Sequence, residues 1–219
     1  MKKLILILSI LTSSYSTYAE EGVYLKGTMG MNHINNGKYE NGVNTGKLKL
    51  KRYFPVVGLG VGYQFDNNLR IETMIDYYFL FSQTETKNIN DIQFKLNLDT
   101  KISDLVFNIY KSFPINEYTS VFAGGGIGIA SIQDEGTGYF IDEGMVGIIE
   151  PSYSRHVYRF THRISTGVEF KIKNSIYAEI SYNYLMLGKN KPQKIDGING
   201  VPKRQFNIHN LTLGLRFLL

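Results

Sequence analysis

The chain has 219 residues, of which 43% are hydrophobic and 20% charged, and its formal net charge is +5. This length and composition suit one folded domain and argue against bulk disorder. Because the sequence has no cysteine, it excludes disulfides, thiolate metal sites and a cysteine nucleophile. With only four histidines, a histidine-rich metal cluster is excluded too, and we expect neither a metal site nor a cofactor.

The first 19 residues have the pattern of a secretory signal peptide. Lys2 and Lys3 precede a short apolar run over residues 4–11, and a Ser/Thr-rich stretch ends at Ala19. The apolar run is too short to cross a bilayer as a helix. We therefore expect residues 1–19 to be a signal peptide and residues 20–219 to form a single exported domain.

Apolar and polar residues alternate with a period of two through most of the remaining chain, which predicts β-strands. Eight strands are expected, at 22–32, 54–65, 69–81, 100–113, 119–131, 157–171, 176–187 and 206–219. Short turns are expected at 66–68, 114–118 and 172–175, and four longer loops at 33–53, 82–99, 132–156 and 188–205. Short turns at one end and long loops at the other are typical of an outer-membrane barrel. The sequence thus predicts an all-β, eight-stranded antiparallel transmembrane barrel with short periplasmic turns and four longer extracellular loops.

The contrast between the two faces of these strands indicates which face meets lipid. One face is bulky and apolar, whereas the other combines glycines with long charged residues, which suits a crowded polar lumen. Aromatic residues near the strand ends, among them Tyr53, Phe54, residues 77–81 and Tyr110, are expected to form interfacial girdles. The expected lumen charge network consists of Arg70, Glu72, Asp76, Arg159, Arg163, Glu169, Glu179 and Arg216. In a barrel this narrow, paired charges favour a plug over a conducting pore.

Histidines raise the possibility of catalysis on lipid A, since some small outer-membrane barrels use a lipid-facing His-Ser-acid triad. The predicted register places His162 on the lipid-facing side, with Ser165 and Glu169 on the other face of the same strand. Residues on opposite faces cannot form a nucleophile–base–orienter chain. No catalytic residues are assigned, and we do not expect an enzyme.

Two of the predicted loops are strongly basic and, after barrel closure, should emerge side by side. The expected ligand-binding patch comprises Lys38, Lys47, Lys49, Lys51, Arg52, Lys189, Lys191, Lys194, Lys203 and Arg204. Such a patch could attract an anionic protein or glycan, contact lipopolysaccharide phosphates, or simply be solvated. A nucleic-acid partner is not expected, because these residues lie on a predicted cell exterior.

Three strand segments resemble a known family. Residues 54–63 (FPVVGLGVGY), 121–128 (VFAGGGIG) and 209–217 (HNLTLGLRF) are similar to the small surface adhesins of rickettsiae and, more distantly, to OmpA-like eight-stranded barrels. The resemblance implies attachment to host cells and capture of the serum protein vitronectin through surface loops. The loops themselves match no family motif.

These observations lead to one leading hypothesis and three alternatives. The leading hypothesis is a non-enzymatic, monomeric outer-membrane surface protein of a Gram-negative bacterium, whose exposed loops bind a host serum or cell-surface protein. The alternatives are a structural barrel that contacts lipopolysaccharide, a lipid A-modifying enzyme, and a narrow pore.

Overall fold

The computed structural model describes residues 21–34, 38–41, 44–47, 53–89, 92–142, 145–189, 193–195, 198–201 and 205–219. The expected signal peptide, residues 1–19, lies outside this part of the chain. Among the described residues, no helix is long and apolar enough to cross a bilayer.

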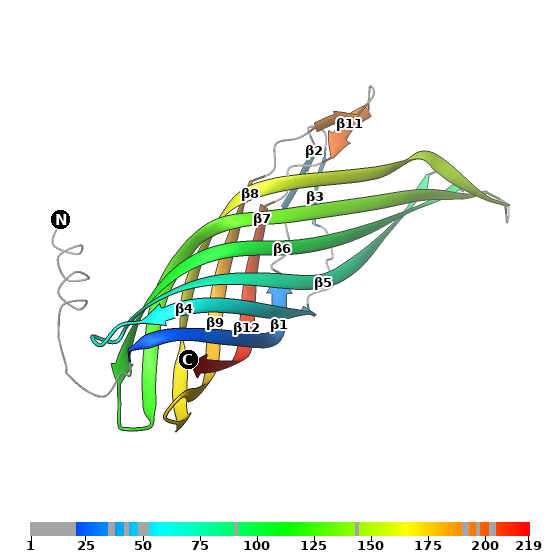
Figure 1. The fold of residues 1–219 in the computed structure, drawn as a ribbon. Helices are drawn as coiled ribbons and strands as arrows, with labels where there is room; N and C mark the ends of the chain where they lie inside the picture. Colours follow the sequence, from blue (N-terminus) through cyan, green and yellow to red (C-terminus); the bar gives the residue numbers. More distant parts are fainter. Residues whose placement is uncertain are drawn as a thin grey trace.

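Eight antiparallel strands close into a barrel in the order β1, β12, β9, β8, β7, β6, β5 and β4 (Figure 1). Their bounds are β1 (Gly22–Ile34), β4 (Tyr53–Gln64), β5 (Leu69–Ile89), β6 (Ile92–Pro114), β7 (Thr119–Asp142), β8 (Met145–Lys173), β9 (Ile176–Lys189) and β12 (Gln205–Leu218). Two small hairpins stand apart from the barrel: β2 (Lys38–Asn41) with β3 (Asn44–Lys47), and β10 (Gln193–Ile195) with β11 (Ile198–Val201). The first and last barrel strands pair directly, so the sheet has no edge around the barrel wall.

The outer wall of the barrel is apolar, as the alternation predicts. Leu25, Leu59 and Leu213 are 50%, 73% and 58% exposed, while their strand neighbours Lys26 and Thr212 are buried in the lumen. A water-soluble barrel would have the opposite arrangement, with apolar residues inside. The outward Leu, Ile and Val side chains therefore face lipid.

Tight turns connect the strands at one end of the barrel. Between β4 and β5, the Phe65 amide donates to the Leu69 carbonyl at 2.9 Å, and Asn68 adopts a positive φ of 63°. Asparagine tolerates this left-handed conformation better than most residues. At the β6–β7 turn, the Ile115 amide donates to the Thr119 carbonyl at 2.9 Å. These short connections mark the periplasmic end.

At the opposite end of the barrel, the prediction of four long loops is wrong for two of them, because the chain continues there as paired strands. β5 and β6 remain paired to Ile89 and Ile92, with a register shift between Tyr78 and Phe81, and β7 and β8 remain paired to Asp142 and Met145, with a shift between Gly136 and Gly138. The segments 82–99 and 132–156 are therefore mostly β-structure, with tips at 90–91 and 143–144 outside the described residues. Figure 1 shows β5, β6, β7 and β8 extending together beyond the shorter strands. We call this extension, from Phe79 on β5 to Thr161 on β8, the projecting sheet.

The aromatic girdle is also only partly as expected. Tyr53, Tyr77 and Phe79 are 65%, 43% and 42% exposed on the outer wall. By contrast, Phe54, Tyr78 and Tyr110 are almost completely buried inside the barrel. Consecutive strand residues point to opposite faces, so adjacent aromatic residues cannot all belong to one girdle.

Candidate functional site

The lumen holds a network of six charges at its periplasmic end, which we call the basal network. Its cations are Lys26, Arg70 and Arg216, and its carboxylates are Glu72, Glu169 and Glu179. All six are buried, with residue exposures of 0% to 6%. Three positive and three negative groups balance, which is the condition under which a protein interior tolerates charge.

The ion pairs of the basal network join strands that are far apart in sequence, and Glu169 and Glu179 are each bonded from more than one strand. Arg70 Nη1 lies 2.6 Å from Glu179 Oε1 and 3.0 Å from Glu169 Oε2. Arg216 bonds the same two glutamates at 3.2 and 2.8 Å. Lys26 Nζ lies 2.7 Å from Glu179 and 3.2 Å from Glu72. The network therefore links β1, β5, β8, β9 and β12 across the lumen.

Aromatic rings pack against the cations of this network. The Arg216 guanidinium lies 4.2 Å from the centre of the Tyr177 ring, and Arg70 lies 4.9 Å from that of Phe122. The Tyr24 hydroxyl donates to Glu72 at 3.1 Å. These contacts fill the space around the charges and hold the guanidinium planes in place.

A second charge cluster lies farther toward the outer end. Arg163 on β8 bonds Asp76 on β5 at 2.5 Å and Asp104 on β6 at 3.1 Å. The Tyr78 hydroxyl donates to Asp104 at 3.0 Å. Asp76 and Asp104 are direct cross-strand partners, and like charges in such positions repel. Arg163 offsets this repulsion from the other side of the lumen.

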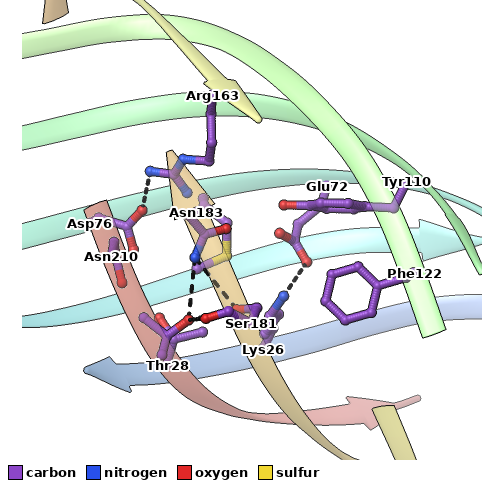
Figure 2. Close-up of a pocket in the computed structure, with 12 residues that line it drawn as sticks. Lys26, Thr28, Glu72, Asp76, Tyr110, Phe122, Arg163, Ser181, Asn183 and Asn210 are labelled. Atoms are coloured by element: carbon purple, nitrogen blue, oxygen red, sulfur yellow. Dashed lines mark hydrogen bonds and ion pairs between the residues drawn. The ribbon is translucent and has the colours of Figure 1, made fainter. Parts of the chain in front are cut away.

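Between the two clusters lies a cavity of about 10 Å³, lined by Lys26, Glu72, Asp76, Arg163 and several hydroxyl and amide side chains (Figure 2). Among the latter, Ser181 and Thr212 share a hydrogen bond of 2.6 Å, and Asn183 donates to Thr212 at 3.3 Å. A volume of this size holds about one water molecule. It is too small for an organic ligand, so it does not form a substrate pocket.

Above the charges, the outer end of the lumen is closed by apolar side chains. We call this group the apolar cap; it consists of Ile34, Phe54, Val56, Tyr78, Ile102, Ala130, Ile132, Leu185, Leu187 and Ile208. Seven of the barrel strands supply its buried members, and β8 adds the half-buried Val157, which packs against them. The sequence predicts a polar lumen throughout, and this apolar layer was not expected, because inward residues such as Phe54 and Ile102 have the same apolar character as the outer wall.

Of the eight residues expected in the lumen network, seven are buried and ion-paired there, and Arg159 is half-buried farther along β8. Lys26 and Asp104 also belong to the paired charges but were left out of the expected set. The alternation along β1 and β6 puts both on the polar faces of their strands. The alternation along each strand shows that these side chains point into the lumen. Only the register between strands shows which charged side chains contact each other.

The basic loop residues fall partly within the structure. The backbone places Lys38 opposite Lys47 in the β2–β3 hairpin, Lys194 in β10 and Lys189 at the end of β9. The β11 strand approaches β2 to within 8 Å between Cα atoms, so the two hairpins are neighbours. The remaining patch residues, Lys49, Lys51, Arg52, Lys191, Lys203 and Arg204, lie outside the described residues.

The histidines considered for catalysis are distributed as the register predicted. His162 is exposed on the outer wall, whereas Ser165 and Glu169 are buried in the lumen. Within the described residues, no group of three or more His, Asp or Glu side chains is arranged to hold a metal ion.

Comparison with known proteins identifies the family. Residues 4–217 match the outer membrane protein beta-barrel domain family, and the chain belongs to it. A candidate adhesin of Rickettsia bellii (strain OSU 85-389) is 27% identical over 99% of both chains. A candidate adhesin of Rickettsia felis is 28% identical, again over 99% of both.

Among solved structures, Neisserial surface protein A has a similar fold. It aligns with a TM-score of 0.52 at 12% identity, covering 90% of this chain and 97% of that protein. At this identity the likeness concerns the fold alone. Family, relatives and fold together place the chain in the outer membrane, with its outer end exposed at the cell surface.

Proposed function

We propose that this outer-membrane barrel is a surface adhesin that binds a host protein with its extracellular end. The observation that carries the proposal is the projecting sheet. A transmembrane strand needs about 9–11 residues, yet β5, β6, β7 and β8 have 21, 23, 24 and 29. The excess extends these four strands well beyond the bilayer, where a host protein can reach them. Relatives over nearly the full length carry the name of candidate adhesins.

The projecting sheet has two open edges on which a partner could form hydrogen bonds. The pairing of β4 with β5 ends at Tyr78, and that of β9 with β8 begins at His162. Beyond these points, within the described residues, β5 and β8 each pair on one side only. An unpaired strand edge presents backbone donors and acceptors to any extended segment that aligns with it.

The basic patch of the two neighbouring hairpins supports the choice of an acidic partner. Lys38 and Lys47 occupy opposite positions of one hairpin, and Lys194 lies in the other. Clustered positive charge raises the association rate of anionic partners and loses strength with added salt. A serum glycoprotein of the vitronectin kind is the ligand class that we propose, and adhesion requires no catalysis.

The test is capture of serum proteins by the refolded barrel, with folding verified by the heat-dependent shift of its gel mobility. The first variant removes residues 84–97 and joins Gln83 to Leu98, which are register partners, through an Asn-Gly turn. The second changes Lys47, Lys49, Lys51, Lys191 and Lys194 to Gln. We expect the deletion to abolish capture and the lysine variant to weaken it most at low salt.

A matched control shortens the other hairpin by removing residues 139–148, which lie between the partners Gly138 and Ile149. This control shows whether one edge or both carry the ligand. If the folded, intact barrel captures no serum or cell-surface protein, the adhesin proposal is wrong. A structural role in contact with lipopolysaccharide would then be the better assignment.

A further inference from the structure

A serine and a histidine form a close pair on the outer wall, at the base of the projecting sheet. Ser131 Oγ on β7 lies 2.7 Å from His156 Nε2 on β8. This is hydrogen-bonding distance, and it joins a hydroxyl to the ring nitrogen that would accept its proton in acyl transfer. Both side chains are accessible, because His156 is exposed and Ser131 is half-buried.

The pair lies where the outer wall changes from apolar to polar. Ile129 and Phe160, which are cross-strand partners, are 54% and 57% exposed on the lipid-facing wall. One step closer to the cell exterior, the next pair of cross-strand partners on this face is Ser131 and Tyr158. Tyrosines favour the membrane interface. The hydroxyl and the imidazole therefore meet the outer leaflet at the depth where its acyl chains join their headgroups.

Two further polar residues share this face. Residues Ser131, Gln133 and Glu135 alternate along β7 and so point to the same side. Gln133 is the register partner of His156, and Glu135 lies one step beyond, opposite Ser154. Both are exposed. Diagonal neighbours on a sheet lie about 7–8 Å apart, within reach of a long side chain.

We propose that Ser131 and His156 are the nucleophile and general base of an esterase that acts on acyl esters of outer-leaflet lipids. Glu135 is the residue placed to orient the imidazole, and the Gln133 amide is placed to donate a hydrogen bond to the developing oxyanion. We assign these roles to Glu135 and Gln133 because both residues lie on the same outer face of the sheet as Ser131 and His156.

The reaction balances with water as the only co-reactant. Ser131 Oγ attacks the ester carbonyl carbon while His156 takes the hydroxyl proton. The bond from that carbon to the alcohol oxygen breaks, and His156 returns the proton to the leaving alcohol. Water, deprotonated by His156, then attacks the acyl-serine, and Ser131 regains its proton as the fatty acid leaves. No oxidant, reductant or metal is needed.

Covalent labelling provides the first test. The refolded barrel is treated with a fluorophosphonate, which reacts with activated serines, and the adduct is located by peptide mass spectrometry. We expect label on Ser131 in the folded barrel, with the labelling rate reduced roughly 100-fold or more in His156→Gln. Ser103 is the matched control, because it is the register partner of Ser131 on the neighbouring strand β6. Label on Ser103 at the same rate, or equal labelling of Ser131 in the His156 variant, would overturn the proposal.

The substrate source is tested in two separate arms, one with purified lipopolysaccharide and one with phosphatidylethanolamine vesicles. Loss of an acyl chain by mass spectrometry in either arm, absent with Ser131→Ala and retained with Ser103→Ala, supports the esterase and identifies its lipid. Intact lipid in both arms overturns it. Because serum capture by the Ser131→Ala barrel should be unchanged, this outcome and the adhesin test can be separated.

Discussion

Arg70 on β5 and Glu179 on β9 approach to 2.6 Å across the lumen, although 109 residues separate them in the chain. Both side chains are only 1% exposed. Glu179 also bonds Lys26 and Arg216, so this one carboxylate connects strands on several sides of the barrel. The basal network thus holds together parts of the wall that have no common hydrogen-bond ladder.

Breaking this contact from one side should be costly. Arg70→Met leaves Glu169 and Glu179 short of a buried cation, and losing one partner of a buried pair costs about 3–5 kcal/mol of unfolding free energy. Because the chain has no tryptophan, unfolding in lipid is best followed by far-ultraviolet circular dichroism and gel mobility. The double variant Arg70→Met with Glu179→Gln restores the charge balance, so its loss should be smaller than the sum of the single losses. Additive losses would contradict a coupled network.

The inward glycines of β4 provide a second prediction. A Cβ at Gly62 would overlap the ring of Tyr24, which is fully buried beside the basal network. Gly62→Ala should therefore destabilise the barrel by about 1–3 kcal/mol, the usual range for overpacking. Gly27→Ala is the matched control, because its nearest neighbour would be Leu59 at 3.9 Å, an ordinary contact. Equal stability of the two variants would mean that the lumen is less tightly packed than the structure shows.

Arg163 provides a third prediction, because its removal leaves two acids facing each other. Asp76 and Asp104 are register partners, and Arg163 is the cation that bonds both. Arg163→Met should destabilise the barrel by at least the roughly 3–5 kcal/mol expected for one orphaned charge. Adding Asp76→Asn should recover part of this loss, since it removes the like-charge repulsion. The same denaturant titration measures both variants, and no recovery in the double variant would argue against the repulsion.

The strands inside the bilayer could be predicted from sequence because lipid imposes a strict alternation on them. Outside the bilayer that constraint is absent, and the segments 82–99 and 132–156 form strands through pairing with each other. His156 lies in the second of these segments. Once that segment was taken as a loop, its contact with Ser131 could not be foreseen, and the pair on the outer wall emerged only with the register of β7 and β8.

Register also explains why the lumen was only partly predictable. The inward direction of Lys26 and Asp104 followed from alternation, but their partners lie on other strands. The apolar cap has a similar origin. Phe54 and Tyr78 point into the lumen, yet aromatic residues of the same kind also lie on the outer wall. A cap residue faces the lumen and a girdle residue faces the outer wall, so neighbours such as Tyr53 and Phe54 belong to different layers.

The final prediction concerns conduction. The lumen is closed by two layers of different chemistry, the apolar cap at the outer end and the basal network at the periplasmic end. An ion would have to leave its hydration shell at the first and displace paired charges at the second. Planar-bilayer recordings of the intact barrel should therefore show no conductance steps. A variant with Leu185→Ala and Leu187→Ala should also stay closed, because thinning the cap leaves the basal network in place. Steps in the intact barrel would restore the narrow-pore alternative, whereas steps only in this variant would show that the cap alone seals the lumen.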